Sequence, residues 1–159
     1  MTAITADSTT SDGPVTDDET LYRAIRNDPR IFAVDADGKP RISSMAFNDP
    51  ARRPSVDRAA LCPGGPAETR NRFSPGSGVL TLNAGEIRSL IVAHGGTGAI
   101  FSVDVEPVPL PANASHAEIF GRPPFDTDRV FERIKQALTR IAKIALATGS
   151  VDTDLPISD

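Results

Sequence analysis

The sequence predicts an α+β fold, in which a small, mainly antiparallel sheet of about four or five strands is covered by a long C-terminal amphipathic helix. Short apolar runs at residues 31–34, 79–82 and 100–105 are separated by Gly, Pro and Asp, a pattern typical of strands. Between Asp126 and Ala147 apolar residues instead recur every three or four positions, as in a helix with one buried face.

The two ends of the chain are acidic and differ from the part between them. Residues 1–18 contain acids and no base, and such a segment cannot offset the entropy of ordering, so we expect it to be disordered. We expect 149–159 to form a flexible acidic tail and 19–148 to form a single globular domain. Residues 21–149 hold all 17 basic residues but only 13 of the 21 acidic ones, a net charge of +4.

The first half of the domain is predicted as a helix, a hairpin and an irregular region. Glu19–Asp28 is assigned to a short helix capped by Asp18, with a strand as the alternative. The turn 35–39 contains Asp37-Gly38, which predicts a hairpin between 31–34 and a returning arm at 41–47. Residues 48–78 are rich in proline and glycine, and one helical turn is expected at 56–61, behind Ser55 as N-cap.

The second half alternates between strands and helices. Strands are expected at 79–82, 100–105 and 115–120, and a short helix at 84–90 with Asn83 as its cap. The long helix 126–147 is capped by Asp126 or Thr127 and ended by Gly149. It would be about 33 Å long at 1.5 Å per residue, enough to cross a small sheet.

Composition narrows the class of protein. A single cysteine, Cys62, excludes an internal disulfide and fits a reducing compartment. The sequence has no secretory signal pattern, and no apolar stretch approaches the roughly 18 residues of a membrane span, so we expect a soluble cytoplasmic protein with no membrane association. Five arginines at 52, 53, 58, 70 and 72 lie near a single aromatic residue, Phe73, which is poor equipment for stacking on nucleic acid and argues against that partner.

Two familiar kinds of site are considered and set aside. The run 94–98 (HGGTG) could cradle a phosphate through backbone amides, but it lacks the Gly-Lys-Ser/Thr of a phosphate-binding loop, so we interpret it as a connection. A zinc site would require His94, His116 and Cys62 to converge, and their spacing does not indicate this. No metal site is predicted.

Polar residues at other positions form a candidate catalytic or binding set. His116 and Glu118 lie two residues apart on a predicted strand, so both side chains point to the same side of it. Arg41 stands near Ser43 and Ser44, and a guanidinium can hold a carboxylate or phosphate with two hydrogen bonds. With the acid of the Ser55-Val56-Asp57 turn added, the set comprises Arg41, Ser44, Asp57, His116 and Glu118. The alternative is that these are ordinary surface residues.

Several short motifs carry a resemblance to known proteins. Leu21-Tyr22-Arg23, 43–47 (SSMAF), 55–57 (SVD) and 116–121 (HAEIFG) resemble the motifs L-x-R, S-S-x-A-F, S-V-D and H-A-x-[IV]-x-G of a group of small uncharacterised bacterial proteins. That resemblance implies a bacterial protein and does not indicate which activity, if any, the protein has. The chain also resembles, more distantly, ADP-ribosyltransferase-type folds, which would use NAD and would give roles to Arg23, Ser43 or Ser44, and Glu118.

Two hypotheses about function follow. The first is a non-catalytic accessory or protein-interaction domain that binds a protein partner through 48–78 or the long helix, because no complete catalytic motif is found and the tails are acidic. The alternative is a small enzyme or ligand-binding protein with a pocket around the candidate set. Its residues would then have to converge within hydrogen-bonding reach of one cleft. The sequence identifies no cofactor.

Overall fold

The computed structural model describes residues 13–93, 96 and 98–149. Its strands are β1 (Thr20–Ile25), β2 (Phe32–Val34), β3 (Pro40–Ile42), β4 (Ser55–Arg58), β5 (Gly78–Asn83), β6 (Ile91–Ala93), β7 (Ile100–Pro107), β8 (His116–Arg122) and β9 (Lys143–Leu146). Its helices are α2 (Pro66–Phe73), α3 (Ala84–Arg88) and α4 (Asp128–Ile141), with 3₁₀ turns η1 (Ser44–Phe47) and η2 (Ala59–Leu61). None of the helices among these residues is long and apolar enough to span a membrane.

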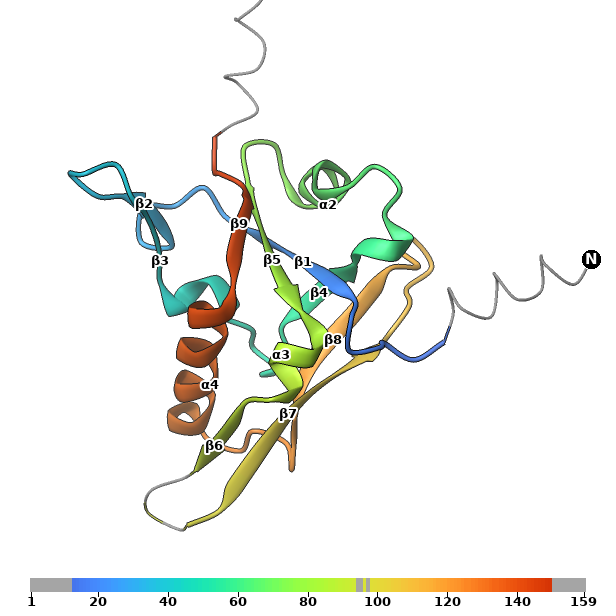
Figure 1. Ribbon diagram of the computed structural model, residues 1–159, viewed down its shortest axis with the longest axis vertical. Coiled ribbons are helices and arrows are strands. Elements are labelled where there is room, and N and C mark those ends of the chain that lie inside the picture. Colours follow the sequence, from blue (N-terminus) through green and yellow to red (C-terminus); the bar gives the residue numbers. More distant parts are fainter. Residues whose placement is uncertain (1–12, 94–95, 97, 150–159) are drawn as a thin grey trace, which may run out of the picture.

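A seven-stranded antiparallel sheet dominates the molecule, in the order β6-β7-β8-β4-β1-β5-β9 (Figure 1). Strands β2 and β3 form a separate hairpin. Helix α4 contacts η1 and β6, α3 contacts β7, and α2 contacts β1 and β5. The predicted fold class is therefore wrong, because the sheet is larger than expected and no long helix covers it.

The alternation of side chains gives the middle strands a core face and a polar face. Leu21 of β1, Val56 of β4 and Ile119 of β8 are buried in one cluster with residues of α4, including Ile134 and Leu138. Residues directly opposite in register lie on the same side of a sheet. Tyr22, Asp57 and His116 are opposite one another across β1, β4 and β8, and therefore share the other, polar face.

The segment predicted as the first helix is the central strand β1. Leu21 and Ile25 are both buried, and their spacing of four residues suits either a helix or a strand. Hydrogen bonding on both sides, to β4 and to β5, decides the conformation. Tertiary pairing has overridden the local preference.

The predicted long helix, 126–147, is wrong in its last six residues. Helix α4 begins after Thr127, whose side chain accepts a hydrogen bond from the Val130 amide as the predicted cap should, but it ends at Ile141. Ala142 is extended, and the chain continues as β9 along β5. In β9, exposed residues alternate with half-buried ones, and this period of two is that of a strand.

The hairpin is confirmed, and the segments after it are partly corrected. Phe32 lies opposite Ile42, and Gly38 takes a positive φ of 86° in the turn. The returning arm stops at Ile42, because the Ser43 side chain caps η1 by accepting from the Met45 amide. The helical turn expected at 56–61 is wrong in its first half, where β4 is a strand, and correct only at η2.

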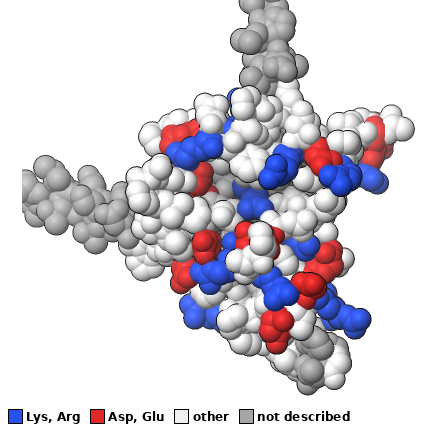
Figure 2. Space-filling view, turned by 180° about the vertical axis from the view of Figure 1, so that it is seen from behind, with Lys and Arg blue, Asp and Glu red and all other residues white. Residues whose placement is uncertain are grey.

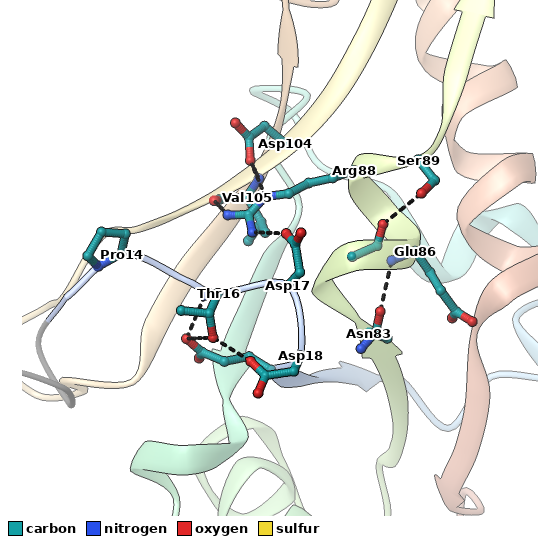
Figure 3. A network of polar contacts seen from close by, with 12 residues as sticks. Pro14, Thr16, Asp17, Asp18, Asn83, Glu86, Arg88, Ser89, Asp104 and Val105 are labelled. Atoms are coloured by element: carbon teal, nitrogen blue, oxygen red, sulfur yellow. Dashed lines mark hydrogen bonds and ion pairs between the residues drawn. The ribbon is translucent and has the colours of Figure 1, made fainter.

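The described residues ahead of β1, from 13 onward, are attached to the sheet. Residues 1–12 of the predicted disordered segment lie outside the described residues, but Val15 is buried in the core. Asp17 accepts a hydrogen bond from Arg88 of α3, which also bonds Asp104 of β7 (Figure 3). We call residues 13–18 the N-terminal arm. Of the predicted C-terminal tail, only Gly149 is described, and its amide donates to the Gly76 carbonyl.

Candidate functional site

A cleft of about 930 Å³ opens where β1 and β4 diverge. The two strands pair only at Leu21 and Tyr22; from Arg23 onward β1 pairs with β5 alone, whereas Ser55 and Val56 pair with β8. The cleft is lined by α2 on one side and by η1, residues 48–52 and α4 on the other. Its volume is typical of small-molecule sites, and we call it the β1–β4 cleft.

Arg23 crosses the gap between the diverging strands. Its Nε donates to the Ala46 carbonyl at 2.9 Å, Nη1 to Ser55 at 2.8 Å and Nη2 to Asn48 at 3.1 Å. A guanidinium has five N–H groups, so two remain without an acceptor among the described residues. Burial lowers the pKa of Arg23 to about 10, although Asp49 favours the charged form, so the side chain is still a cation at neutral pH.

The cleft carries an excess of positive charge. Its lining residues include six basic side chains (Arg23, Arg26, Arg30, Arg52, Arg72 and Lys135) and four acidic ones (Asp28, Asp49, Asp57 and Asp128). Within the described part of the chain, Arg23 and Arg26 make no ion pair; Arg26 instead lies over the exposed ring of Phe73, 5.6 Å from its centre. On the face seen in Figure 2, acidic and basic side chains are interspersed.

Asp57 holds one wall of the cleft together. Its two carboxylate oxygens accept hydrogen bonds from Asn113 at 2.8 Å, from Thr69 at 2.7 Å and from Arg72 at 3.0 Å. Burial alone would raise the pKa of Asp57, but these hydrogen bonds outweigh it and hold the pKa below its usual value. A carboxylate whose oxygens are occupied in this way is an anchor for α2 and the 108–115 loop.

His116 and Ser55 form a hydrogen-bonded pair on the polar face. Nε2 of His116 lies 3.2 Å from the Ser55 Oγ, and Nδ1 lies 2.8 Å from the Val108 carbonyl oxygen. Both residues are half-buried, and Ser55 lines the cleft.

The five predicted site residues do not gather in one place. Asp57 lines the cleft and lies opposite His116 in register. Glu118 pairs with Arg53 at 2.6 Å, outside the cleft lining. Arg41 pairs with Asp35 at 3.0 Å in the β2–β3 hairpin, and the Ser44 hydroxyl donates to Glu132 of α4 at 2.8 Å.

The sequence predicted Ser55 as a helix cap and as part of the 55–57 motif, and it pointed to Arg23 only through a resemblance. Because β4 is a strand, the side chains of Ser55 and Asp57 lie on the same face of it. His116 of β8 lies directly opposite Asp57 on that face, and its imidazole reaches the Ser55 hydroxyl. The position of Arg23 depends on the divergence of β1 and β4, and no local pattern in the sequence signals it.

No metal site is found among the described residues, where no three His, Cys, Asp or Glu side chains gather closely enough to hold an ion. Three residues of the 94–98 run (94, 95 and 97) lie outside the described residues. Comparison with protein-family models, with curated proteins and with solved structures found no match.

Proposed function

We propose that the protein binds a small organic anion, with a phosphate or carboxylate group, in the β1–β4 cleft. The observation that supports this most directly is Arg23, a largely desolvated cation whose hydrogen-bond acceptors among the described residues are all neutral carbonyl groups. A desolvated charge is costly unless an opposite charge compensates it. An anion that accepts the two remaining N–H groups would provide that compensation, with the bidentate geometry that guanidinium favours.

The opposite side of the cleft suits the body of such a molecule. Tyr22 and Phe73 both line it, and Phe73 is 45% exposed. Arg26 lies over the Phe73 ring and adds a second cation with no carboxylate partner among the described residues. An anion with a planar or apolar body could therefore place its charged group on Arg23 and its body against these rings.

The other hypotheses have less support. The roles that an ADP-ribosyltransferase would give to Ser44 and Glu118 compete with contacts that occupy both side chains, to Glu132 and to Arg53. NAD is nevertheless an organic anion and belongs among the probes. The protein-interaction hypothesis stays a prediction, and co-purification from the native host would test it.

Titration of the ¹⁵N-labelled protein with inorganic phosphate, citrate and NAD would test the proposal. We expect saturable shifts of the Tyr22–Arg26 amides and of the Arg23 Nε–H signal, with millimolar affinity for inorganic phosphate, about −4 kcal/mol. Arg23→Lys keeps the charge but loses the planar fork, and should weaken binding at least tenfold. The matched control Arg122→Lys replaces a surface arginine of β8 that pairs with Asp104, and should bind normally.

Two results would overturn the proposal: no saturable shift with any of the three probes, or equal affinity in the wild type and Arg23→Lys. If Arg23→Lys does not fold, Arg26→Gln replaces it. Arg26 is exposed, contacts Phe73 and makes no ion pair with a described residue, so its loss should leave the fold intact. That variant should bind the same probe several-fold more weakly.

A further inference from the structure

We infer that Ser55 and His116 act as nucleophile and general base, and that the protein hydrolyses a carboxylic ester of the anion bound in the β1–β4 cleft. The inference rests on the proposed function, because Arg23 would hold the charged end of the substrate. It concerns a separate property of the same cleft, the reactivity of the Ser55 hydroxyl.

The contacts of His116 define which nitrogen carries the proton. The Val108 carbonyl can only accept a hydrogen bond, so Nδ1, 2.8 Å away, must donate to it. In the neutral ring Nε2 is then the acceptor, and it faces the Ser55 hydroxyl at 3.2 Å. A hydroxyl, a base within hydrogen-bond reach and a third group that orients the base are the components of an activated serine.

The neighbouring carboxylates leave the imidazole free for this role. Asp57, opposite His116 in register, is occupied by Arg72, Thr69 and Asn113. Glu118, two residues along β8, is paired with Arg53. Among the described residues no carboxylate lies within ion-pair distance of His116, so no carboxylate competes with Ser55 for the ring.

The anion site and the hydroxyl belong to the same short stretch of backbone. Arg23 Nη1 donates to the carbonyl of Ser55, the residue whose side chain meets His116. Ser55 also lines the cleft, but its side chain lies on the face shared with Asp57 and His116, whereas Arg23, next to Tyr22 in β1, lies on the other face. A substrate held by Arg23 must therefore meet the hydroxyl through the gap between the diverging strands. An ester with a second, negatively charged group fits this arrangement better than a neutral ester.

The reaction balances without a cofactor. Ser55 Oγ attacks the ester carbonyl carbon while its proton passes to His116 Nε2, and the excess positive charge of the cleft favours the developing oxyanion. The C–O bond to the alcohol breaks and the alcohol takes the proton from Nε2. Water then attacks the acyl-enzyme by the same route, which releases the acid and restores Ser55.

An organofluorophosphonate probe tests the nucleophile directly. Oγ would bond to phosphorus, fluoride would leave, and the proton would pass to His116. Peptide mass spectrometry should locate the adduct on Ser55; Ser55→Ala should abolish it, and His116→Gln should slow it about 100-fold or more, as loss of a general base does. Ser102→Ala removes another hydroxyl from the same face and should change nothing.

Turnover and binding separate the two proposals. Mono-4-nitrophenyl terephthalate, whose free carboxylate is held rigidly away from the ester carbonyl, should be hydrolysed by the protein at least tenfold faster than 4-nitrophenyl benzoate, which lacks that carboxylate. This protein-dependent hydrolysis should require both Ser55 and His116. Ser55→Ala should still bind inorganic phosphate, because Arg23 contacts the backbone carbonyl and not the hydroxyl. Phosphate binding without an adduct on Ser55 would overturn this inference and leave the proposed function standing. An adduct without phosphate binding would overturn the anion site.

Discussion

Two arginines on neighbouring strands, Arg58 of β4 and Arg23 of β1, have opposite surroundings. Arg58 is 3% exposed and donates twice to the Glu19 carboxylate, at 2.9 and 2.7 Å. Two more N–H groups reach the Gly13 and Pro14 carbonyls of the N-terminal arm. Arg23 lines the cleft, and its three hydrogen bonds all end on carbonyl groups.

The difference separates a structural arginine from one available to a ligand. Four of the five N–H groups of Arg58 are used and its charge is neutralised by Glu19, so it can offer little to another molecule. Arg23 retains both unused donors, and although Asp49 favours its charged form, no carboxylate among the described residues forms an ion pair with it. Buried ion pairs and open cations should therefore respond in opposite ways to mutation and to added anions.

The largest expected effect is the loss of Arg58. Arg58→Met leaves the Glu19 carboxylate, whose side chain is only 12% exposed, without its charged partner, and should lower the free energy of unfolding by about 3 kcal/mol in urea denaturation. The double variant Arg58→Met/Glu19→Leu removes both charges and should recover part of that loss. A single variant as stable as the wild type would show that the pair does not hold the arm.

The next effect concerns pH, through Glu19 and Asp57. Burial opposes the charged form of each, but hydrogen bonds outweigh it, from Arg58 and Thr16 in one case and from Asn113, Thr69 and Arg72 in the other, so both pKa values are lowered. A carboxylate with a lowered pKa stabilises the fold above its usual pKa, and this stability is lost as the pH falls through the lowered value.

Urea denaturation at a series of pH values should therefore show stability falling below about pH 4.5, where the unfolded chain begins to bind more protons than the folded one. Asp57→Asn should cost about 1–3 kcal/mol at neutral pH, because the amide can accept fewer of the three hydrogen bonds. It should also make the acid dependence shallower than that of the wild type. A parallel dependence in the two proteins would mean that Asp57 is already protonated in the fold.

The sequence predicted the elements that local chemistry determines. The Asp37-Gly38 hairpin, the Asn83 and Thr127 caps, and strands β5, β7 and β8 each depend on residues within a few positions of one another. The helix predicted over β1 failed because Leu21 and Ile25, four residues apart, suit both a helix and a strand. The helix extended through β9 failed because Ile141 and Ile144, three residues apart, continue the helical period although the helix ends at Ile141. Pairing with β5, distant in sequence, decides both cases.

The candidate site was less predictable for the same reason. Asp57 and His116 were selected because they are polar and were placed in strands or turns, and the register brings them opposite each other. Arg41 and Ser44 were selected on the same grounds and lie in the hairpin and η1, where Asp35 and Glu132 occupy them. Whether a polar residue faces a cleft depends on where strands separate, and this is a property of the sheet and not of any segment.

A smaller loss of stability is expected at Arg23. Arg23→Met deprives three carbonyl groups of their donor but also removes a desolvated charge, and these effects oppose each other. We expect a net cost of about 1–2 kcal/mol, below that of Arg58→Met. Inorganic phosphate well above its dissociation constant should raise the melting temperature of the wild type but not of Arg23→Met. Equal stabilisation of both proteins would place the anion elsewhere.

The smallest effect should come from the outer contact of the N-terminal arm, which sharpens the contrast between buried and exposed charges. Arg88 bonds Asp17 at 2.7 Å, but the Asp17 side chain is 78% exposed (Figure 3). Exposed ion pairs contribute about 0.2–1 kcal/mol, and salt screens them. Asp17→Asn should therefore cost less than about 1 kcal/mol in urea denaturation at low ionic strength, and almost nothing at about 1 M salt. If it destabilised the protein as much as Arg58→Met at both salt concentrations, burial would not be what distinguishes the two attachments of the arm.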